Sequence, residues 1–168
     1  MEELIKYCPV NRQTMLFSAT MTPRIEDLIK LSLKRPVRIK TESSHLTVAP
    51  RLVQEFVKVK DKDDVEAILL SLIQRGFHQK TIVFFELKRE AHRFCALLNL
   101  SEVRAVELHG DLPQIQRFMS LDAFRTGEVD VLVATDVAAR GIDIPGVQTV
   151  INAEMPRNVS IYVHRVGR

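Results

Sequence analysis

Two hydrophobic periods alternate along this chain, one typical of helices and one of strands. Continuous apolar runs at residues 81–85 and 129–134 indicate strands covered on both faces, and weaker runs predict strands at 52–59, 103–108 and 147–151. Helices are expected where apolar residues recur three and four positions apart, as in Val65, Ile68, Leu69, Leu72 and Ile73, then in Ala91, Phe94, Cys95 and Leu98. The same reasoning predicts helices at 112–125 and 159–166.

This alternation predicts an α/β fold from about residue 51 onward. Strands joined by helices through short connections form a doubly wound parallel sheet with helices on both faces. Ligands of such sheets bind outside the carboxyl ends of the strands. We therefore expect the loops at 86–88, 109–111 and 135–143 to lie at one edge of the sheet and to carry the chemistry.

The first forty residues predict less structure of their own. A strand is expected at 13–17, a helix should begin at Pro23 with Thr22 as its N-cap, and another strand is expected at 37–39. Residues 41–50 are rich in Ser, Thr and Pro and are interpreted as a linker. The chain is thus divided into a partial domain at 1–40, a linker at 41–50 and a full domain at 51–168.

Composition narrows the class of protein without naming it. The chain has 168 residues, 46% of them hydrophobic, and a net charge of +3, which permits nucleic-acid binding but does not demonstrate it. Cys8 and Cys95 stand alone, so we expect free thiols in a reducing compartment and no metal site. No apolar run approaches the roughly 18 residues of a membrane helix, and the first ten residues do not form a signal peptide.

The loop at 135–143 carries the most candidate chemistry. Thr135 could donate to a phosphate oxygen, Asp143 could accept from a ribose hydroxyl, and Gly141 would let a ligand approach the backbone closely. The competing interpretation is that Asp136 and Asp143 cap local turns while Arg140 neutralises them. On residue chemistry alone this structural interpretation is slightly favoured.

Two other segments offer polar groups at predicted strand or helix ends. In the segment 164–168, two arginines suit phosphate contacts and transition-state charge, although a solvated basic helix face is the more common meaning of such a pair. Asp111 and Gln114 have the spacing of a capping box, and Arg117 could reach a phosphate one turn later. His109 is more typical of a strand-end histidine with satisfied hydrogen bonds than of a catalyst.

In their order and spacing these segments resemble the DEAD-box family of ATP-dependent RNA helicases. Ser18, Ala19 and Thr20 are similar to motif III, and residues 83–88 occupy motif IV, where Glu86 is unusual. Gln114 with Arg117 is similar to the QxxR element, residues 134–143 to motif V and residues 164–168 to motif VI. Residues 47–56 resemble the domain junction found in the branch of this family that is involved in nucleolar ribosome assembly.

The resemblance implies two RecA-like domains that close over ATP and RNA. Residues 1–40 would be the end of the helicase ATP-binding domain, with an exposed apolar helix face that includes Ile25, Leu28 and Ile29. Residues 51–168 would be the helicase C-terminal domain, truncated within motif VI. The implied RNA-binding residues are Gly110, Gln114, Arg117 and Thr135. Nucleotide binding falls to Gly141, Asp143 and Arg168, catalysis to Arg168, His164 and Arg165, and interdomain coupling to Ser18, Ala19, Thr20 and Arg140.

Two motifs of the family are absent from this chain. It has no GxxxxGK[ST] phosphate loop and no Asp-Glu-Ala-Asp run. We therefore expect ATP and Mg²⁺ to act in the intact parent, none to be held by this chain alone, and the isolated chain to be inactive. The other hypothesis is an RNA- or partner-binding module without enzymatic activity. Expected partners are RNA with little sequence specificity, ATP and other ribosome-assembly or RNP proteins, with no membrane. The expected location is inside the cell, in the nucleus or nucleolus.

Overall fold

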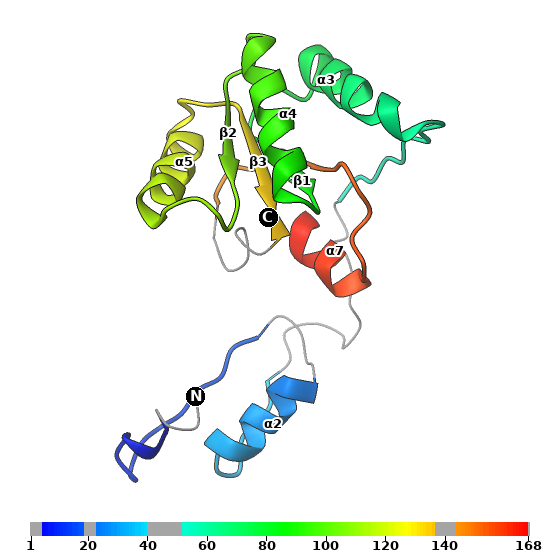
Figure 1. The fold of residues 1–168 in the computed structure, drawn as a ribbon. Helices are drawn as coiled ribbons and strands as arrows, with labels where there is room; N and C mark the ends of the chain where they lie inside the picture. The colour runs from blue at the N-terminus through cyan, green and yellow to red at the C-terminus, as the bar shows by residue number, and fades with distance from the viewer. Residues whose placement is uncertain (1–4, 19–22, 40–51, 137–143, 168) are drawn as a thin grey trace. The chain divides into compact units, whose positions relative to one another are not determined.

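The computed structural model describes residues 5–18, 23–39, 52–136 and 144–167, which belong to two compact units, 1–46 and 47–168 (Figure 1). The division between the units falls inside the segment interpreted as a linker. The assignment of residues 1–40 to a preceding helicase domain stays a prediction. Among the helices that the structure describes, none combines the length and the apolar character that a membrane span requires.

A parallel sheet of four strands forms the centre of the second unit. The strands are β1 (Thr81–Phe85), β2 (Ala105–Leu108), β3 (Val131–Thr135) and β4 (Thr149–Asn152), and their order is β2-β3-β1-β4. All three neighbouring pairs are parallel. The predicted α/β class with a parallel sheet is therefore confirmed.

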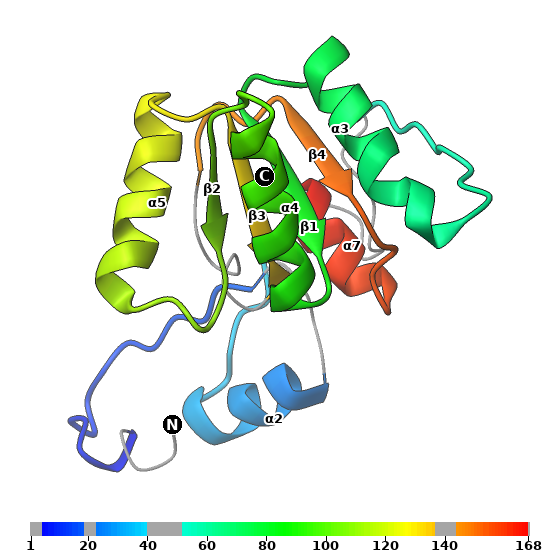
Figure 2. The ribbon, with the colours of Figure 1, turned by 45° about the horizontal axis from the view of Figure 1, so that its top comes forward.

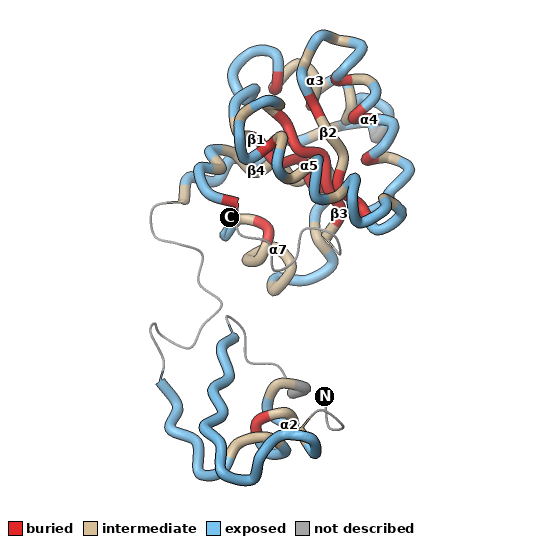
Figure 3. Tube along the Cα trace, turned by 90° about the vertical axis from the view of Figure 1, so that its left-hand side faces the viewer, coloured by how far each residue is buried: buried red, intermediate tan, exposed pale blue. Residues whose placement is uncertain are grey.

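Helices cover both faces of this sheet, which explains why β1 and β3 are buried along their whole length (Figures 2 and 3). Successive strand side chains point to opposite faces. Val83, Phe85 and Val133 pack with α3 (Val65–Arg75) and α4 (Lys88–Leu100), whereas Ile82 and Phe84 pack on the side of α5 (Gln114–Thr126). The two apolar layers hold the carboxyl edge of the sheet in place.

Most predicted elements of this unit exist, with shifted ends. The apolar stripe predicted for α4 is the set of residues that α4 buries, and α7 (Val159–Val166) has the predicted bounds. The capping box is wrong: Pro113 precedes α5, and Asp111 pairs with Lys88 instead. A short helix, η1 (Lys62–Asp64), precedes α3, so Asp61 accepts from the Asp63 N–H at the start of η1. No strand forms within the described part of 52–59.

In the first unit the helix expected from Pro23 forms as α2 (Pro23–Ser32), while its expected N-cap Thr22 lies outside the described residues. The described residues of this unit form no strand at 13–17 or 37–39, because no neighbouring strand supplies the hydrogen bonds. The expected apolar exposure of the helix is wrong: Ile29 is only 8% exposed, and Ile25 and Leu28 are half-buried. The exposed apolar side chains of this unit belong mainly to the extended segments.

Candidate functional site

The carboxyl ends of the four strands finish at one edge of the sheet. The register aligns Phe84 of β1 with Ala134 of β3 and with Asn152 of β4, and it aligns Leu108 of β2 with Ala134. The loops at 86–88 and 109–111 and the start of the loop at 135–143 therefore leave the sheet on the same side. Residues 153–158 form a further loop at this edge that the sequence patterns did not single out.

Arg165 of α7 is the best-anchored charged group at this edge. Its guanidinium donates from Nε to Asp136 Oδ1 (2.6 Å) and from Nη2 to Asp136 Oδ2 (2.9 Å), a bidentate ion pair. Its Nη1 donates to Asn152 Oδ1 (2.8 Å) and to the Glu154 carbonyl oxygen (3.0 Å). The planar fork of an arginine suits such multiple contacts, which an ammonium group cannot reproduce. One side chain thus joins α7 to the ends of β3 and β4.

Burial makes this pair different from a surface salt bridge. The Arg165 side chain is 3% exposed and that of Asp136 is 21% exposed, and the guanidinium carbon lies 5.1 Å from the centre of the Phe84 ring. The interpretation that Asp136 only caps a local turn is wrong, because its carboxylate pairs with a residue 29 positions later. The guanidinium is held inside the protein, where its three nitrogens donate to Asp136, Asn152 and Glu154.

A second pair lies at the end of β1. Arg157 donates from Nε to Glu86 Oε1 (2.7 Å), and the Glu86 backbone N–H donates to Glu154 Oε2 (2.9 Å). Glu86, which is unusual for motif IV, thus has a structural role. It ties the loop after β1 to the loop after β4, a contact that sequence reasoning missed because the partners lie 71 positions apart.

The loop after β2 and the start of α5 contain three of the four proposed RNA-contacting residues. Gly110 is exposed, and the loop is fastened by an ion pair between Lys88 Nζ and Asp111 Oδ1, which lowers the pKa of the Asp111 carboxyl through that hydrogen bond. Gln114 begins α5, and its side-chain oxygen accepts from Arg117 Nη1 at 3.1 Å. Gly110, Gln114 and Arg117 are therefore close in sequence and placed at the carboxyl edge.

The remaining predicted site residues are distributed unevenly. Thr135 ends β3 and is 5% exposed, His164 in α7 is half-buried, and Ser18 is exposed in the first unit. The others lie outside the described residues: Ala19, Thr20, Arg140, Gly141, Asp143 and Arg168.

A doubly wound parallel sheet, with a buried arginine of its last described helix tied to the strand ends, is consistent with a RecA-like domain. The chain belongs to the family of helicase conserved C-terminal domains, which it matches over residues 64–168. It is 52% identical to DEAD-box ATP-dependent RNA helicase 28 of Arabidopsis thaliana over 99% of this chain. It is 50% identical to the probable ATP-dependent RNA helicase DDX27 of Homo sapiens, also over 99% of this chain.

Solved structures agree with this assignment. The structure of S. cerevisiae Dbp5 bound to RNA and ADP BeF3 is similar with a TM-score of 0.85 and 27% identity, covering 99% of this chain and 44% of that one. The curated relatives are much longer: this chain spans 21% of the Arabidopsis protein and 22% of the human one. The resemblance to DEAD-box helicases is thus confirmed.

Proposed function

We propose that this chain is the part of an ATP-dependent RNA helicase that closes over RNA and the terminal phosphate of ATP, coupling hydrolysis to duplex unwinding or RNP remodelling. The observation that carries the proposal is the buried Arg165 network. Asp136 directly precedes the segment 137–143, and Arg165 lies three residues before Arg168. One rigid pair therefore anchors the starting points of both the motif V-like and the motif VI-like segments.

The roles divide between the two ligands. Gly110, Gln114, Arg117 and Thr135 would contact the RNA backbone, because the set contains a glycine, polar groups and a cation but no aromatic platform for bases. Toward ATP, the resemblance assigns Gly141, Asp143 and Arg168. An arginine at the terminal phosphate stabilises charge that develops in the transition state. Arg165 would hold this arrangement in position without touching the phosphate.

Interdomain coupling is proposed for His164 and Arg140 of the second unit and for the segment from Ser18 through Ala19 to Thr20. These groups correspond to parts of the helicase motifs that meet when two motor domains close. The proposal for them rests on the order and spacing of the motifs.

Magnesium requires oxygen ligands that are free to coordinate. At the described carboxyl edge, each of three carboxylates is already paired with a cation: Asp136 with Arg165, Glu86 with Arg157, and Asp111 with Lys88. These residues do not fit a magnesium site. We propose that Mg²⁺ and most phosphate contacts are supplied by other parts of the parent helicase.

RNA binding by this chain can be tested directly. A labelled single strand is titrated at two salt concentrations, with Arg117→Ala as the test variant and Arg104→Ala as the control. Arg104 pairs with Asp130 just before β2 and β3, at the opposite edge of the sheet. We expect weak, salt-dependent and nearly sequence-blind binding that Arg117→Ala reduces and Arg104→Ala leaves nearly unchanged. Strong base preference, or equal loss in both variants, would contradict the proposed interface.

Catalysis is tested by steady-state ATP hydrolysis with and without RNA. The isolated chain should show no turnover above buffer, because it lacks the phosphate loop and the acidic run that phosphoryl transfer requires. In the intact parent, Arg168→Ala should lower turnover and leave ATP-independent RNA binding nearly unchanged. RNA-stimulated ATP turnover by the isolated chain would refute the proposal that hydrolysis needs other parts of the parent helicase. Unchanged turnover of the Arg168→Ala parent would show that Arg168 does not act at the terminal phosphate.

The alternative function is an RNA- or partner-binding module without enzymatic activity. It differs from the helicase in requiring no upstream phosphate loop, so the upstream coding sequence distinguishes the two. The resemblance at 47–56 supports a nuclear or nucleolar location and partners in ribosome assembly. Imaging of the tagged parent protein would test that location.

A further inference from the structure

Three potential metal ligands meet between α4 and the end of β2. They are His92 of α4, Glu107 of β2 and His109, which directly follows β2. His92 Nδ1 lies 2.8 Å from Glu107 Oε2, and His109 Nε2 lies 3.3 Å from the same oxygen. One ligand atom from each residue lies within 4.8 Å of the other two.

His109 distinguishes this cluster from an ordinary surface ion pair. It is 7% exposed, yet neither ring nitrogen has a hydrogen-bond partner among the residues that the structure describes. The expectation of a histidine with satisfied hydrogen bonds is therefore wrong. Although His109 Nε2 is near Glu107, the geometry is not that of a hydrogen bond. Burying a polar atom without a hydrogen-bond partner costs free energy of folding. Because His109 lies two residues after Glu107, the alternation of side chains along a strand turns both toward the same face of the sheet.

We propose that His92, Glu107 and His109 form a binding site for a divalent transition-metal ion of the zinc class. Two imidazoles and one carboxylate are a donor set that zinc accepts while keeping a fourth position open. Donors around a tetrahedral ion with bonds of about 2.1 Å lie about 3.4 Å apart. The separations of 2.8 and 3.3 Å from Glu107 Oε2 lie below that value, and no two ligand atoms are more than 4.8 Å apart, so small side-chain movements suffice to bind the ion.

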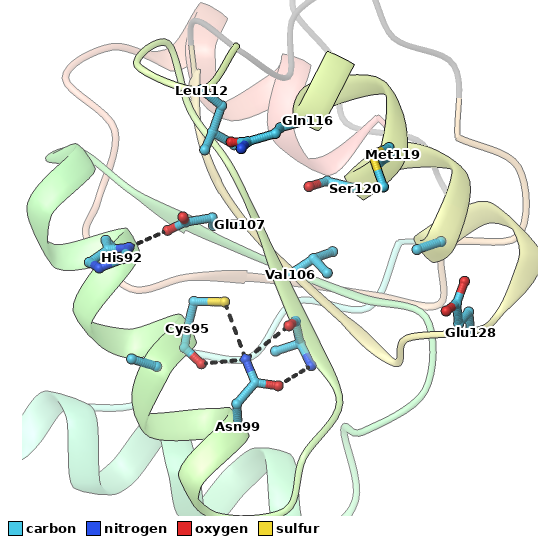
Figure 4. A pocket seen from close by; sticks show the side chains of 13 residues that line it. His92, Cys95, Asn99, Val106, Glu107, Leu112, Gln116, Met119, Ser120 and Glu128 are labelled. Carbon is cyan, nitrogen blue, oxygen red and sulfur yellow. Dashed lines mark hydrogen bonds and ion pairs between the residues drawn. The ribbon is translucent and has the colours of Figure 1, made fainter. Parts of the chain in front are cut away.

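The surroundings allow an ion and a fourth ligand to enter. His92 and Glu107 point toward each other at the side of an open pocket of about 530 Å³ that residues of α4, β2 and α5 line (Figure 4). A water molecule or a small anion in this pocket completes the coordination. The bound ion joins α4 to the end of β2. Since His109 precedes Gly110, it also holds the start of the loop to which RNA contact is assigned, a consequence that rests on the proposed function.

This site is chemically distinct from the magnesium of ATP hydrolysis. Magnesium prefers oxygen ligands, whereas imidazole nitrogens favour zinc, copper, nickel or iron. His92 lies 15 residues before Glu107 on a different element, and the two cysteines contribute nothing to the set. We expected no metal site because Cys8 and Cys95 stand alone in the sequence. The proposed site uses no cysteine, so that argument does not apply to it.

The test is a calorimetric titration of the metal-free chain with Zn²⁺ in excess Mg²⁺. We expect one Zn²⁺ to bind per chain. His92→Ala and Glu107→Gln should each weaken the Zn²⁺ affinity more than about tenfold, because replacing even a residue that only hydrogen-bonds to a metal ligand lowers metal affinity by that factor. His78→Ala removes an exposed histidine outside the cluster, and Cys8→Ser removes the exposed thiol. Both controls should bind like the unaltered chain.

Co²⁺ provides a second readout, since its visible absorption reports tetrahedral nitrogen and oxygen coordination. His92 has a side chain that is 70% exposed, so its replacement should leave the fold intact, as circular dichroism can verify. Absence of Zn²⁺ binding by the unaltered chain, unchanged binding by His92→Ala, or loss of binding in Cys8→Ser would each overturn the proposal. The titration contains no RNA or ATP, so its failure would leave the proposed helicase function untouched.

Discussion

Replacing Arg165 by alanine removes the side chain that joins α7 to β3 and β4. The variant leaves the Asp136 carboxylate without its bidentate partner and frees the acceptors on Asn152 and Glu154. Removing one member of a buried ion pair typically costs 3–5 kcal/mol of stability. Because the Asp136 side chain is 21% exposed and can regain some water, we expect a loss of about 3 kcal/mol, at the lower end of this range.

The matched control is Arg157→Ala at the same edge of the sheet. Arg157 also pairs with a carboxylate, that of Glu86, but the two side chains are 80% and 36% exposed. Exposed pairs contribute about 0–1 kcal/mol. Arg165→Lys should fall between the two variants, because an ammonium keeps the charge but cannot make the bidentate contact.

Urea denaturation followed by circular dichroism measures these differences. A double-mutant cycle with Asp136→Ala should give a coupling energy of at least about 1 kcal/mol, within the range for residues in one network. If Arg165→Ala destabilised the protein no more than Arg157→Ala, the buried pair would not be the anchor of α7. Arg165 would then not fix the position of the motif VI-like segment, residues 164–168.

Three further predictions follow from burial and backbone geometry. Burial, with a smaller contribution from the charge of Glu107, raises the pKa of the Cys95 thiol to about 12; iodoacetamide at pH 8 should therefore modify the exposed Cys8 rapidly and Cys95 only after unfolding. Phe94→Ala opens a cavity beside Phe85 and should lower the free energy of unfolding by about 3–5 kcal/mol, measured by urea denaturation; a loss below about 1 kcal/mol would contradict the packing. Gly127→Ala should cost about 1–2 kcal/mol in the same assay, because Gly127 ends α5 at a φ of 81° and an added Cβ would be strained there; an unchanged midpoint would show that the turn relaxes.

Local patterns in the sequence were sufficient for most elements of the second unit. Periodicity identified β1, the buried stripe of α4 and the bounds of α7, because helix and strand repeats are properties of neighbouring residues. The same reasoning failed for the segments 13–17, 37–39 and 52–59. A strand requires a hydrogen-bonded neighbour, and that neighbour is not encoded in the apolar pattern of the segment itself.

The sequence by itself determined the alternation of strands and helices, the parallel sheet and, through motif order, the helicase family. Only the tertiary structure decided which charges meet: Arg165 with Asp136, Glu86 with Arg157, and His109 beside Glu107 and His92. The strand order β2-β3-β1-β4 and its register bring these residues together from positions up to 71 apart. Backbone periodicity is short-ranged, whereas the partner of a buried charge depends on which strand ends become neighbours after the chain has crossed the sheet.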